Sequence, residues 1–167
     1  MPPSGLEDIR NYRPVDDRLS SAGQPTVAQL ESVARAGFEV VINLALHNDP
    51  KYSLPDETGL VRSLGMRYVH IPVQWSNPTE ADLHAFFVAM DEAAGSKTFV
   101  HCAANYRVSA FLGLYRVMKR REPAETAFAQ LLALWRPDAV WTRFIATMLA
   151  RGGVQSPLFP QPEAAAD

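Results

Sequence analysis

The sequence predicts an α/β protein in which a central, mostly parallel sheet is flanked by helices. Short β-branched apolar runs such as 38–44 and 68–73 alternate with stretches that carry helix start and stop signals. Alternation of this kind is typical of parallel strands joined by helices. The chain has 167 residues, of which 47% are hydrophobic and 20% charged. That length and composition indicate one globular domain with a substantial core.

The first half of the chain is expected to form a helix, a strand and a second helix. Thr26 opens the first helix, because Gln29 three residues later completes a capping-box pattern, and Gly37 ends it. The apolar run 38–44 is the buried strand that follows. After a long loop, a short helix is expected over 56–64.

The second half adds two strands and four helices. The expected order is strand 68–73, a helix from 78 that ends at Gly95, strand 98–100, a helix that follows Arg107 and runs through Met118, a helix from Pro123, and a last helix capped by Asp138. The helix after Arg107 is apolar nearly all round, so we expect it to be central and buried. Residues 1–10 and 153–167 are expected to be flexible tails on either side of a domain spanning 11–152.

Charge and composition exclude several classes of function. The 16 basic and 18 acidic side chains give a net charge of −2, which argues against nucleic acid as a partner. No apolar run approaches ~18 residues, so no membrane-spanning helix is expected. The N-terminus lacks a signal-peptide pattern and one cysteine cannot form an internal disulfide, so we expect a cytoplasmic protein. No histidine has a metal-ligand spacing, and neither a metal nor a cofactor is expected.

The single cysteine lies in the turn between strand 98–100 and the buried helix. Ligands of open α/β sheets bind at the carboxyl ends of strands, and a helix N-terminus offers unpaired N–H donors to an anion or a thiolate. Ala103 and Ala104 are small enough to let the backbone approach a ligand, and Arg107 can grip two oxygens as a fork. A nucleophile, an amide cradle and an arginine together predict attack on a phosphate-like group. The alternative is that Cys102 is an inert core residue.

Residues 101–109 resemble a known signature. His101-Cys102, followed by Arg107 and Ser109, is similar to the motif of cysteine-dependent protein phosphatases, which reads HC, five residues, R, then S or T. Segments 19–25, 37–44 and 65–73 are similar to the bacterial dual-specificity-like tyrosine phosphatases, and the resemblance covers about residues 11–150. It implies a dual-specificity phosphatase-like fold and hydrolysis of phosphate monoesters through a cysteinyl-phosphate. The partner would be a phosphorylated protein or a small phosphate ester, with phosphotyrosine or an aryl phosphate as the expected substrate.

The same resemblance assigns roles to the residues of the turn. Cys102 would be the nucleophile, and the phosphate-binding residues would be Ala103, Ala104, Asn105, Tyr106 and Arg107. His101 is expected to order the loop. Outside the turn, the residue type and position of Trp75 suit either a floor or wall of the site or an ordinary packed or exposed side chain. Ser109 either hydrogen-bonds the thiolate or bonds its own helix backbone.

The spacing departs from the family pattern. Four residues separate Cys102 from Arg107, a C-x4-R arrangement that is one residue short. Either one residue is deleted from the loop, or Arg107 lies one helical position early and Val108 takes the usual arginine position. A sulfurtransferase similar to rhodanese, whose cysteine loop is also shorter, is therefore an alternative function.

The general acid is the second departure. Related phosphatases carry an Asp in the loop that corresponds to 73–78, and this loop has no carboxylate here. Asp56 is the first candidate, with Glu57, Glu80 and Asp82 as alternatives, and all four are also suited to helix starts. Loss of a general acid typically costs 10²–10⁴-fold in rate. A phosphate- or phosphoprotein-binding protein without turnover is therefore the other alternative.

Overall fold

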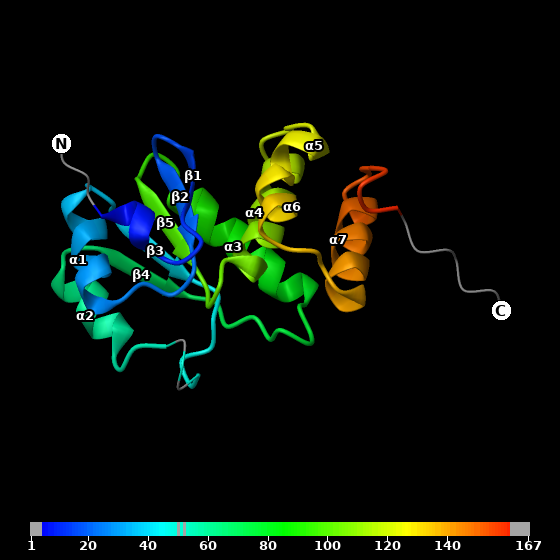
Figure 1. The fold of residues 1–167 in the computed structure, drawn as a ribbon. Coiled ribbons are helices and arrows are strands. Elements are labelled where there is room, and N and C mark those ends of the chain that lie inside the picture. The colour runs from blue at the N-terminus through cyan, green and yellow to red at the C-terminus, as the bar shows by residue number, and fades with distance from the viewer. Residues whose placement is uncertain (1–4, 50, 52, 161–167) are drawn as a thin grey trace.

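A computed structural model describes residues 5–49, 51 and 53–160 (Figure 1). Its sheet has the strand order β1-β2-β5-β3-β4. The strands are β1 (Arg13–Asp16), β2 (Leu19–Ala22), β3 (Val40–Asn43), β4 (Arg67–His70) and β5 (Thr98–His101). β1 and β2 are antiparallel, and every other pair is parallel. The predicted mostly parallel sheet is confirmed, although the sequence analysis did not identify β1 or β2 as strands.

β5 is the central strand, and its end defines the edge where the candidate site lies. All four of its residues are buried. His101 is level with Ala22 of β2 on one side and with Asn43 of β3 on the other. Because these three strands are parallel, their carboxyl ends meet at the same edge of the sheet.

Helices cover both faces of the sheet (Figure 1). α1 (Val27–Arg35) and α2 (Glu57–Ser63) lie on one face, and α3 (Glu80–Glu92) and α4 (Tyr106–Met118) lie on the other. Alternate strand residues point to opposite faces, so Val100 packs in the α3–α4 core while Phe99 packs in the α1–α2 core. Cys102 belongs to the α3–α4 core.

The helix after Arg107 is central, as predicted. In α4 the side chains from Arg107 to Leu114 are all buried. It contacts α5 (Ala124–Ala127), α6 (Ala129–Leu134) and α7 (Ala139–Arg151). The single helix predicted from Pro123 is divided between α5 and α6 at Phe128, which lies fully buried beneath them with φ −99° and ψ 5°.

Helix starts follow the predicted capping residues. Thr26 and Gln29 form the expected capping box, and Thr79 and Asp82 form another. Asp138 accepts a hydrogen bond from the backbone of Trp141 at the start of α7. These starts were predictable because the interaction spans only three residues.

The ordered core extends beyond the predicted domain limits. Leu6, in the 3₁₀ turn Leu6–Asp8, and Ile9 are buried against α1 and the sheet, so residues 5–10 are not the expected loose tail. Phe159 is also buried and its ring lies 4.9 Å from that of Phe128. Residues 1–4 and 161–167 of the predicted tails lie outside the described part of the chain. Among the helices that the structure describes, none has the length and apolar character needed to cross a bilayer.

Candidate active site

The turn between β5 and α4 carries the only cysteine of the chain. Cys102 directly follows β5, and its side chain is buried, with 1% of the residue exposed. Its backbone N–H donates to the carbonyl of Ala22 at 3.3 Å, which continues the pairing of β5 with β2. Residues 102–106, called the Cys102 loop below, therefore begin at the carboxyl end of the central strand and end at the first residue of α4.

The carbonyl groups of the Cys102 loop are held by neighbouring segments. The backbone N–H of Gln24 donates to the carbonyl of Ala103 at 3.0 Å, and Asn11 Nδ2 donates to the carbonyl of Ala104 at 2.9 Å. In a trans peptide unit the N–H points opposite to the carbonyl, and the described residues include no cis peptide. The N–H of Ala104 therefore points away from the Gln24 backbone, and an isolated antiparallel bridge pairs Ala104 with Gly23 just after β2. The loop thus holds its peptide groups in one orientation, which an anion-binding nest requires.

Gly23 permits this close approach. It lies directly after β2, and a Cβ atom at this position would be 2.6 Å from the carbonyl oxygen of Ala103. Any larger residue would push the loop away from the segment that anchors it. Gly23 belongs to segment 19–25, which the sequence analysis compared with the phosphatase family, and its lack of a side chain lets the loop pack closely there.

Asn105 turns the Cys102 loop into α4. Its backbone is left-handed, with φ 70°, a conformation that Asn adopts more easily than most residues. Its Nδ2 donates to the carbonyl of Asn11 at 2.9 Å and to Ser21 Oγ at 3.0 Å. The side chain thus ties the loop to the segment before β1 and to β2.

Arg107 lies in the first turn of α4 and is 9% exposed. Its Nη1 donates to the carbonyl of Val73 at 2.8 Å. Within the described residues, Nε and Nη2 have no hydrogen-bond partner, so one edge of the fork is available to a ligand. Val73 and Cys102 belong to the same apolar cluster, so the guanidinium lies on the face of the sheet that also holds the thiol. Val108, the residue at the alternative arginine position, packs in this core as well.

His101 and Glu57 form a buried side-chain pair. Nε2 of His101 lies 2.7 Å from Glu57 Oε2, and both side chains are at most 1% exposed. Burial raises the pKa of Glu57, but the charge and hydrogen bond of His101, together with a bond from Gln24, outweigh it and hold this pKa below its ordinary value. A carboxyl with a lowered pKa is a poor proton donor at neutral pH, which argues against Glu57 as the general acid.

The other three candidate acids also have structural partners. Asp56 Oδ1 accepts a hydrogen bond from the backbone of Gly59 at the start of α2. Asp82 is part of the capping box of α3. Glu80 pairs with Arg151 of α7. The contacts of Asp56 and Asp82 agree with the helix-start interpretation, and Glu80 lies in the first turn of α3.

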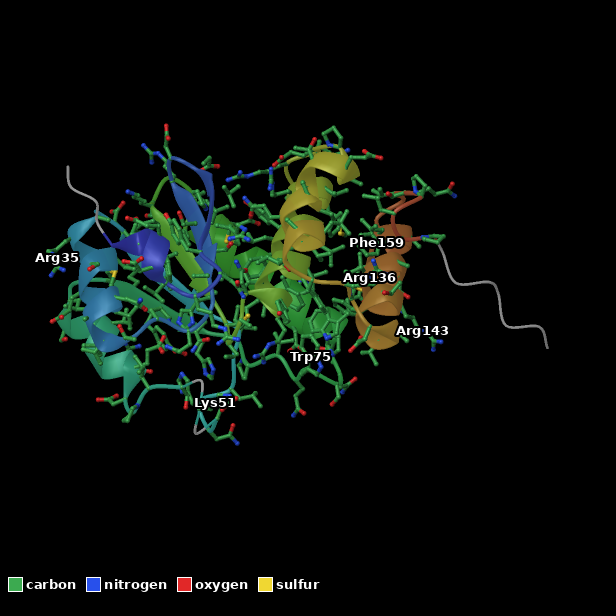
Figure 2. All side chains as sticks on the ribbon, in the orientation of Figure 1. Arg35, Lys51, Trp75, Arg136, Arg143 and Phe159 are labelled. Carbon is green, nitrogen blue, oxygen red and sulfur yellow. The ribbon has the colours of Figure 1, made fainter. Side chains whose placement is uncertain are left out.

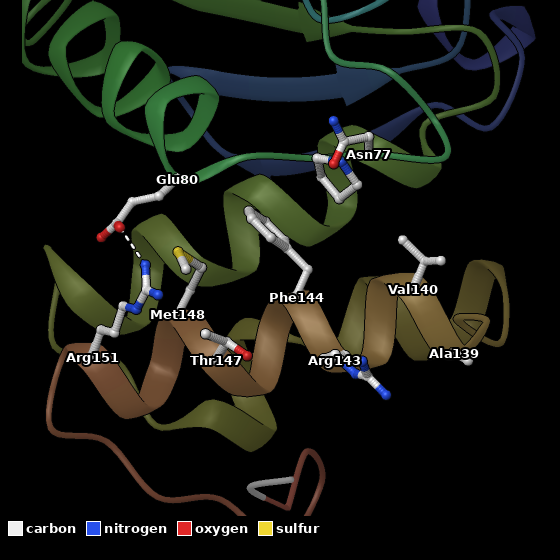
Figure 3. A pocket seen from close by; sticks show the side chains of 10 residues that line it. Asn77, Glu80, Ala139, Val140, Arg143, Phe144, Thr147, Met148 and Arg151 are labelled. Atoms are coloured by element: carbon white, nitrogen blue, oxygen red, sulfur yellow. Dashed lines mark hydrogen bonds and ion pairs between the residues drawn. The ribbon is translucent and has the colours of Figure 1, made fainter. Parts of the chain in front are cut away.

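Glu80 and Arg151 lie at one end of a groove of about 460 Å³ along α7, and Asn77 lies near the other end (Figure 3). Phe144 and Met148 point into the groove from α7 (Figure 3). None of its lining residues belongs to the Cys102 loop. Glu80 therefore lines a groove that is separate from the Cys102 loop.

Aromatic side chains gather beside the Cys102 loop. Trp75 lies in the segment between β4 and α3 (Figure 2) and is 41% exposed. Its ring centroid is 6.3 Å from Tyr106 and 5.3 Å from Trp135, and these two rings stack at 5.0 Å. Trp141 Nε1 donates to the carbonyl of Trp75 at 2.8 Å, which fixes the segment. This position suits the wall predicted for Trp75.

Ser109 bonds its own helix backbone in this structure. Its Oγ donates to the carbonyl of Tyr106 at 2.7 Å and accepts from Trp135 Nε1 at 2.9 Å. The hydroxyl proton is therefore engaged away from the thiol, which matches the second of the two roles predicted for this serine.

The sequence analysis missed Asn11, Gly23 and Gln24, which hold the Cys102 loop from outside. Asn11 is 93 residues from the carbonyl that it binds, and no local pattern reports a contact at that separation. Among the residues that the structure describes, no group of three His, Cys, Asp or Glu side chains is placed to hold a metal ion.

Comparisons with known proteins identify the family. Residues 6–137 match the family model described as DSP-PTPase phosphatase fused to NAD+ kinase. A beta-lactamase hydrolase-like protein of Xylella fastidiosa (strain Temecula1) is 30% identical over 153 residues, which are 86% of this chain and 32% of that protein. The chain thus spans about a third of this curated relative, and only 22% of a second one from Agrobacterium fabrum.

Solved structures agree with this match. A DUF442 protein of Shewanella putrefaciens CN-32, described as a candidate phosphatase, is 36% identical with a TM-score of 0.80, and the match covers 88% of this chain and 96% of that one. Tk-PTP in its active form shares the fold, with 22% identity, a TM-score of 0.67, and coverage of 84% and 95%. The resemblance seen in residues 101–109 is thereby confirmed at the level of the family. The chain belongs to the DSP-PTPase phosphatase family.

Proposed function

We propose that the protein hydrolyses aryl phosphate monoesters, phosphotyrosine among them, through a cysteinyl-phosphate on Cys102. The observation that carries this proposal is the turn between β5 and α4. It combines a single thiol at the strand end, a loop whose carbonyls are held by Asn11 and Gln24, and the free edge of Arg107 on the same face of the sheet.

The reaction would proceed in two displacements. The Cys102 thiolate attacks phosphorus, and the bond between phosphorus and the phenolic oxygen breaks as that oxygen leaves with its electron pair. The loop N–H groups and Arg107 would stabilise the charge on the other phosphoryl oxygens. Water then attacks the phosphocysteine, which releases inorganic phosphate and restores the thiolate.

Two features favour an aryl group as the leaving group. The segment 73–78 carries no carboxylate, and the four candidate acids are engaged in helix caps or with oppositely placed side chains. A phenol, with a pKa of about 10, leaves without much help from an acid, whereas an aliphatic alcohol does not. Trp75, Tyr106 and Trp135 also present aromatic surface beside the loop, against which a phenyl ring can pack.

The test is hydrolysis of p-nitrophenyl phosphate between pH 4.5 and 8.5 by the wild type, Cys102→Ser and Arg107→Lys. We expect no turnover above background for Cys102→Ser, and a loss of about 10²–10³-fold for Arg107→Lys because the fork is lost. Since the chain has one cysteine, a phosphoryl adduct found by mass spectrometry after rapid acid quench can be assigned to Cys102. Circular dichroism of each variant controls for folding. An inert wild type, or a Cys102→Ser variant as active as the wild type, would overturn the proposal.

The engaged carboxylates favour a second candidate, a phosphate-binding protein that does not turn over. In that case phosphate would protect Cys102 from alkylation while p-nitrophenyl phosphate remains intact. The sulfurtransferase alternative rests on loop length alone, and persulfide formation on Cys102 with thiosulfate would be its signature.

A further inference from the structure

We infer that Asn11 and Asn105 are positioning residues that hold the short Cys102 loop in the shape that binds an oxyanion. The inference rests on the proposed function of that loop. The two asparagines form a reciprocal clamp. Asn11 Nδ2 donates to the carbonyl of Ala104, and Asn105 Nδ2 donates to the carbonyl of Asn11, both at 2.9 Å. They are 94 residues apart in the sequence.

The length of the loop explains why such a clamp is required. Four residues separate Cys102 from Arg107, and none of them is glycine. The chain must nevertheless reverse from the end of β5 into α4, and Asn105 achieves this with a left-handed backbone. A non-glycine residue in this region is strained relative to glycine, and contacts of its side chain can offset that strain. The contacts of Asn105 Nδ2 with Asn11 and with Ser21 Oγ provide that support.

The clamp also sets the direction of the peptide groups. While Asn11 holds the carbonyl of Ala104, the N–H of Asn105 in the same peptide unit must point the opposite way. If this unit turned over, the antiparallel bridge between Ala104 and Gly23 would be lost and the path of the loop between Cys102 and Arg107 would change. Because the loop connects the thiol to the guanidinium, such a change would move one relative to the other, so the clamp affects anion affinity as well as fold stability.

Asn11 is itself placed for this task. Its backbone is left-handed, with φ 51°, and it lies just before β1, the antiparallel partner of β2. Asn105 is fully buried, whereas Asn11 is half-buried. The Ser21 hydroxyl that accepts from Asn105 donates in turn to the carbonyl of Arg13. The loop is thereby connected to both strands at this side of the sheet.

Substitution by glycine removes the side-chain amide but keeps the left-handed backbone, because glycine adopts that conformation without strain. The effect of the amide can therefore be measured by itself. Asn11→Gly removes one hydrogen bond of the clamp, and Asn105→Gly removes the other together with the bond to Ser21. Arg121→Gly is the matched control, since Arg121 also has a left-handed backbone, with φ 60°, but is exposed and outside the Cys102 loop.

The measurement is the concentration of inorganic phosphate that protects Cys102 from iodoacetamide, made well below each melting temperature. We expect Asn11→Gly and Asn105→Gly to need at least about 10-fold more phosphate than the wild type, and Arg121→Gly to be unchanged. In p-nitrophenyl phosphate hydrolysis, kcat should fall in both clamp variants, because the loop would no longer hold Cys102 and Arg107 in the geometry for attack. The double variant should lose less than the product of the single losses, because both bonds fix the same loop.

The outcomes separate this inference from the proposed function. If phosphate protects Cys102 of the wild type from iodoacetamide but the wild type does not hydrolyse p-nitrophenyl phosphate, the proposed hydrolysis is wrong. The clamp can then still be tested by the protection assay. Clamp variants that melt earlier yet bind phosphate as the wild type does would show a structural role only, and the inference would be wrong. A wild type that phosphate does not protect would overturn both. If Asn105→Gly does not fold, Asn11→Gly alone decides.

Discussion

At the scale of single residues, the His101–Glu57 pair connects the Cys102 loop to α2. His101 Nε2 faces the Glu57 carboxylate at 2.7 Å, while Nδ1 lies 3.4 Å from the carbonyl of Cys102. Both ring nitrogens thus face oxygen acceptors, which orients the imidazole beside the strand end. Gln24, whose backbone N–H holds the carbonyl of Ala103, binds Glu57 through its side chain. One carboxylate therefore supports the loop from two directions.

Glu57→Gln should destabilise the fold in a pH-dependent manner. The pKa of Glu57 in the folded state lies below its ordinary value of 4.5, so its ionised form stabilises the protein. That contribution is complete above about pH 4.5 and is lost as the pH falls through the folded pKa. At pH 7 we expect a loss on the order of 1–3 kcal/mol in unfolding free energy, measured by urea denaturation. Toward pH 3 the difference between wild type and variant should shrink.

Glu80→Gln is the matched control for this prediction. Glu80 also pairs with an oppositely charged side chain, but both partners are more than half exposed, and exposed pairs contribute roughly 0–1 kcal/mol. If Glu57→Gln is as mild as Glu80→Gln at pH 7, the buried pair does not stabilise the fold. A difference that grows as the pH falls would contradict the assigned direction of the pKa.

At the scale of elements, α4 positions the site because it is packed on all sides. Its residue Gly113 faces Phe128, the residue at which α5 ends and α6 begins. A Cβ atom at Gly113 would lie 2.3 Å from the Phe128 ring, which is fully buried. The absence of a side chain at Gly113 thus lets the α5–α6 segment approach α4 closely.

Gly113→Ala should therefore lower stability although alanine favours helices. Alanine gains about 1 kcal/mol over glycine inside a helix, but overpacking a buried ring costs about 1–3 kcal/mol or more. We expect a net decrease in melting temperature. Gly152→Ala is the control, since its new Cβ would meet chiefly the flexible end of Met118, at 3.0 Å. Equal melting temperatures for the two variants would show that Phe128 can move aside.

The elements also show what sequence reasoning can reach. Helix starts at Thr26, Thr79 and Asp138 were predicted because each cap acts over three residues. The break between α5 and α6 at Phe128 was not predicted, since it depends on packing against α4 that the local pattern does not encode.

The Cys102 turn was predicted because its residues are adjacent in the sequence. The residues that anchor the turn were not predicted, because the Glu57–His101 pair spans 44 positions and the Asn11 contact spans 93.

At the scale of the whole molecule, the sheet order brings distant segments to one edge. β5 lies between β2 and β3 in the sheet, although more than 50 residues separate it from β3 in the sequence. The segments that follow β2 and β5, together with Asn11 before β1, meet at the Cys102 loop. The strand order of the sheet therefore assembles the site. The site stays in place only while the whole domain is folded.

The C-terminal segment contributes to the stability of the domain through Phe159. Phe159 is 4% exposed, and its ring centroid lies 4.9 Å from that of Phe128. Phe159→Ala should cost about 3–5 kcal/mol if the contact is fully packed, seen as a lower urea midpoint with an unchanged slope. Leu132→Ala, at a half-exposed position, should stay within about 0.5 kcal/mol of the wild type.

The loss of Phe159 should also affect α4. Because Phe128 packs on α4, removing its contact with Phe159 should loosen the helix that carries Arg107. Should Phe159→Ala match Leu132→Ala, the segment after α7 would be a tail after all, as its composition predicted.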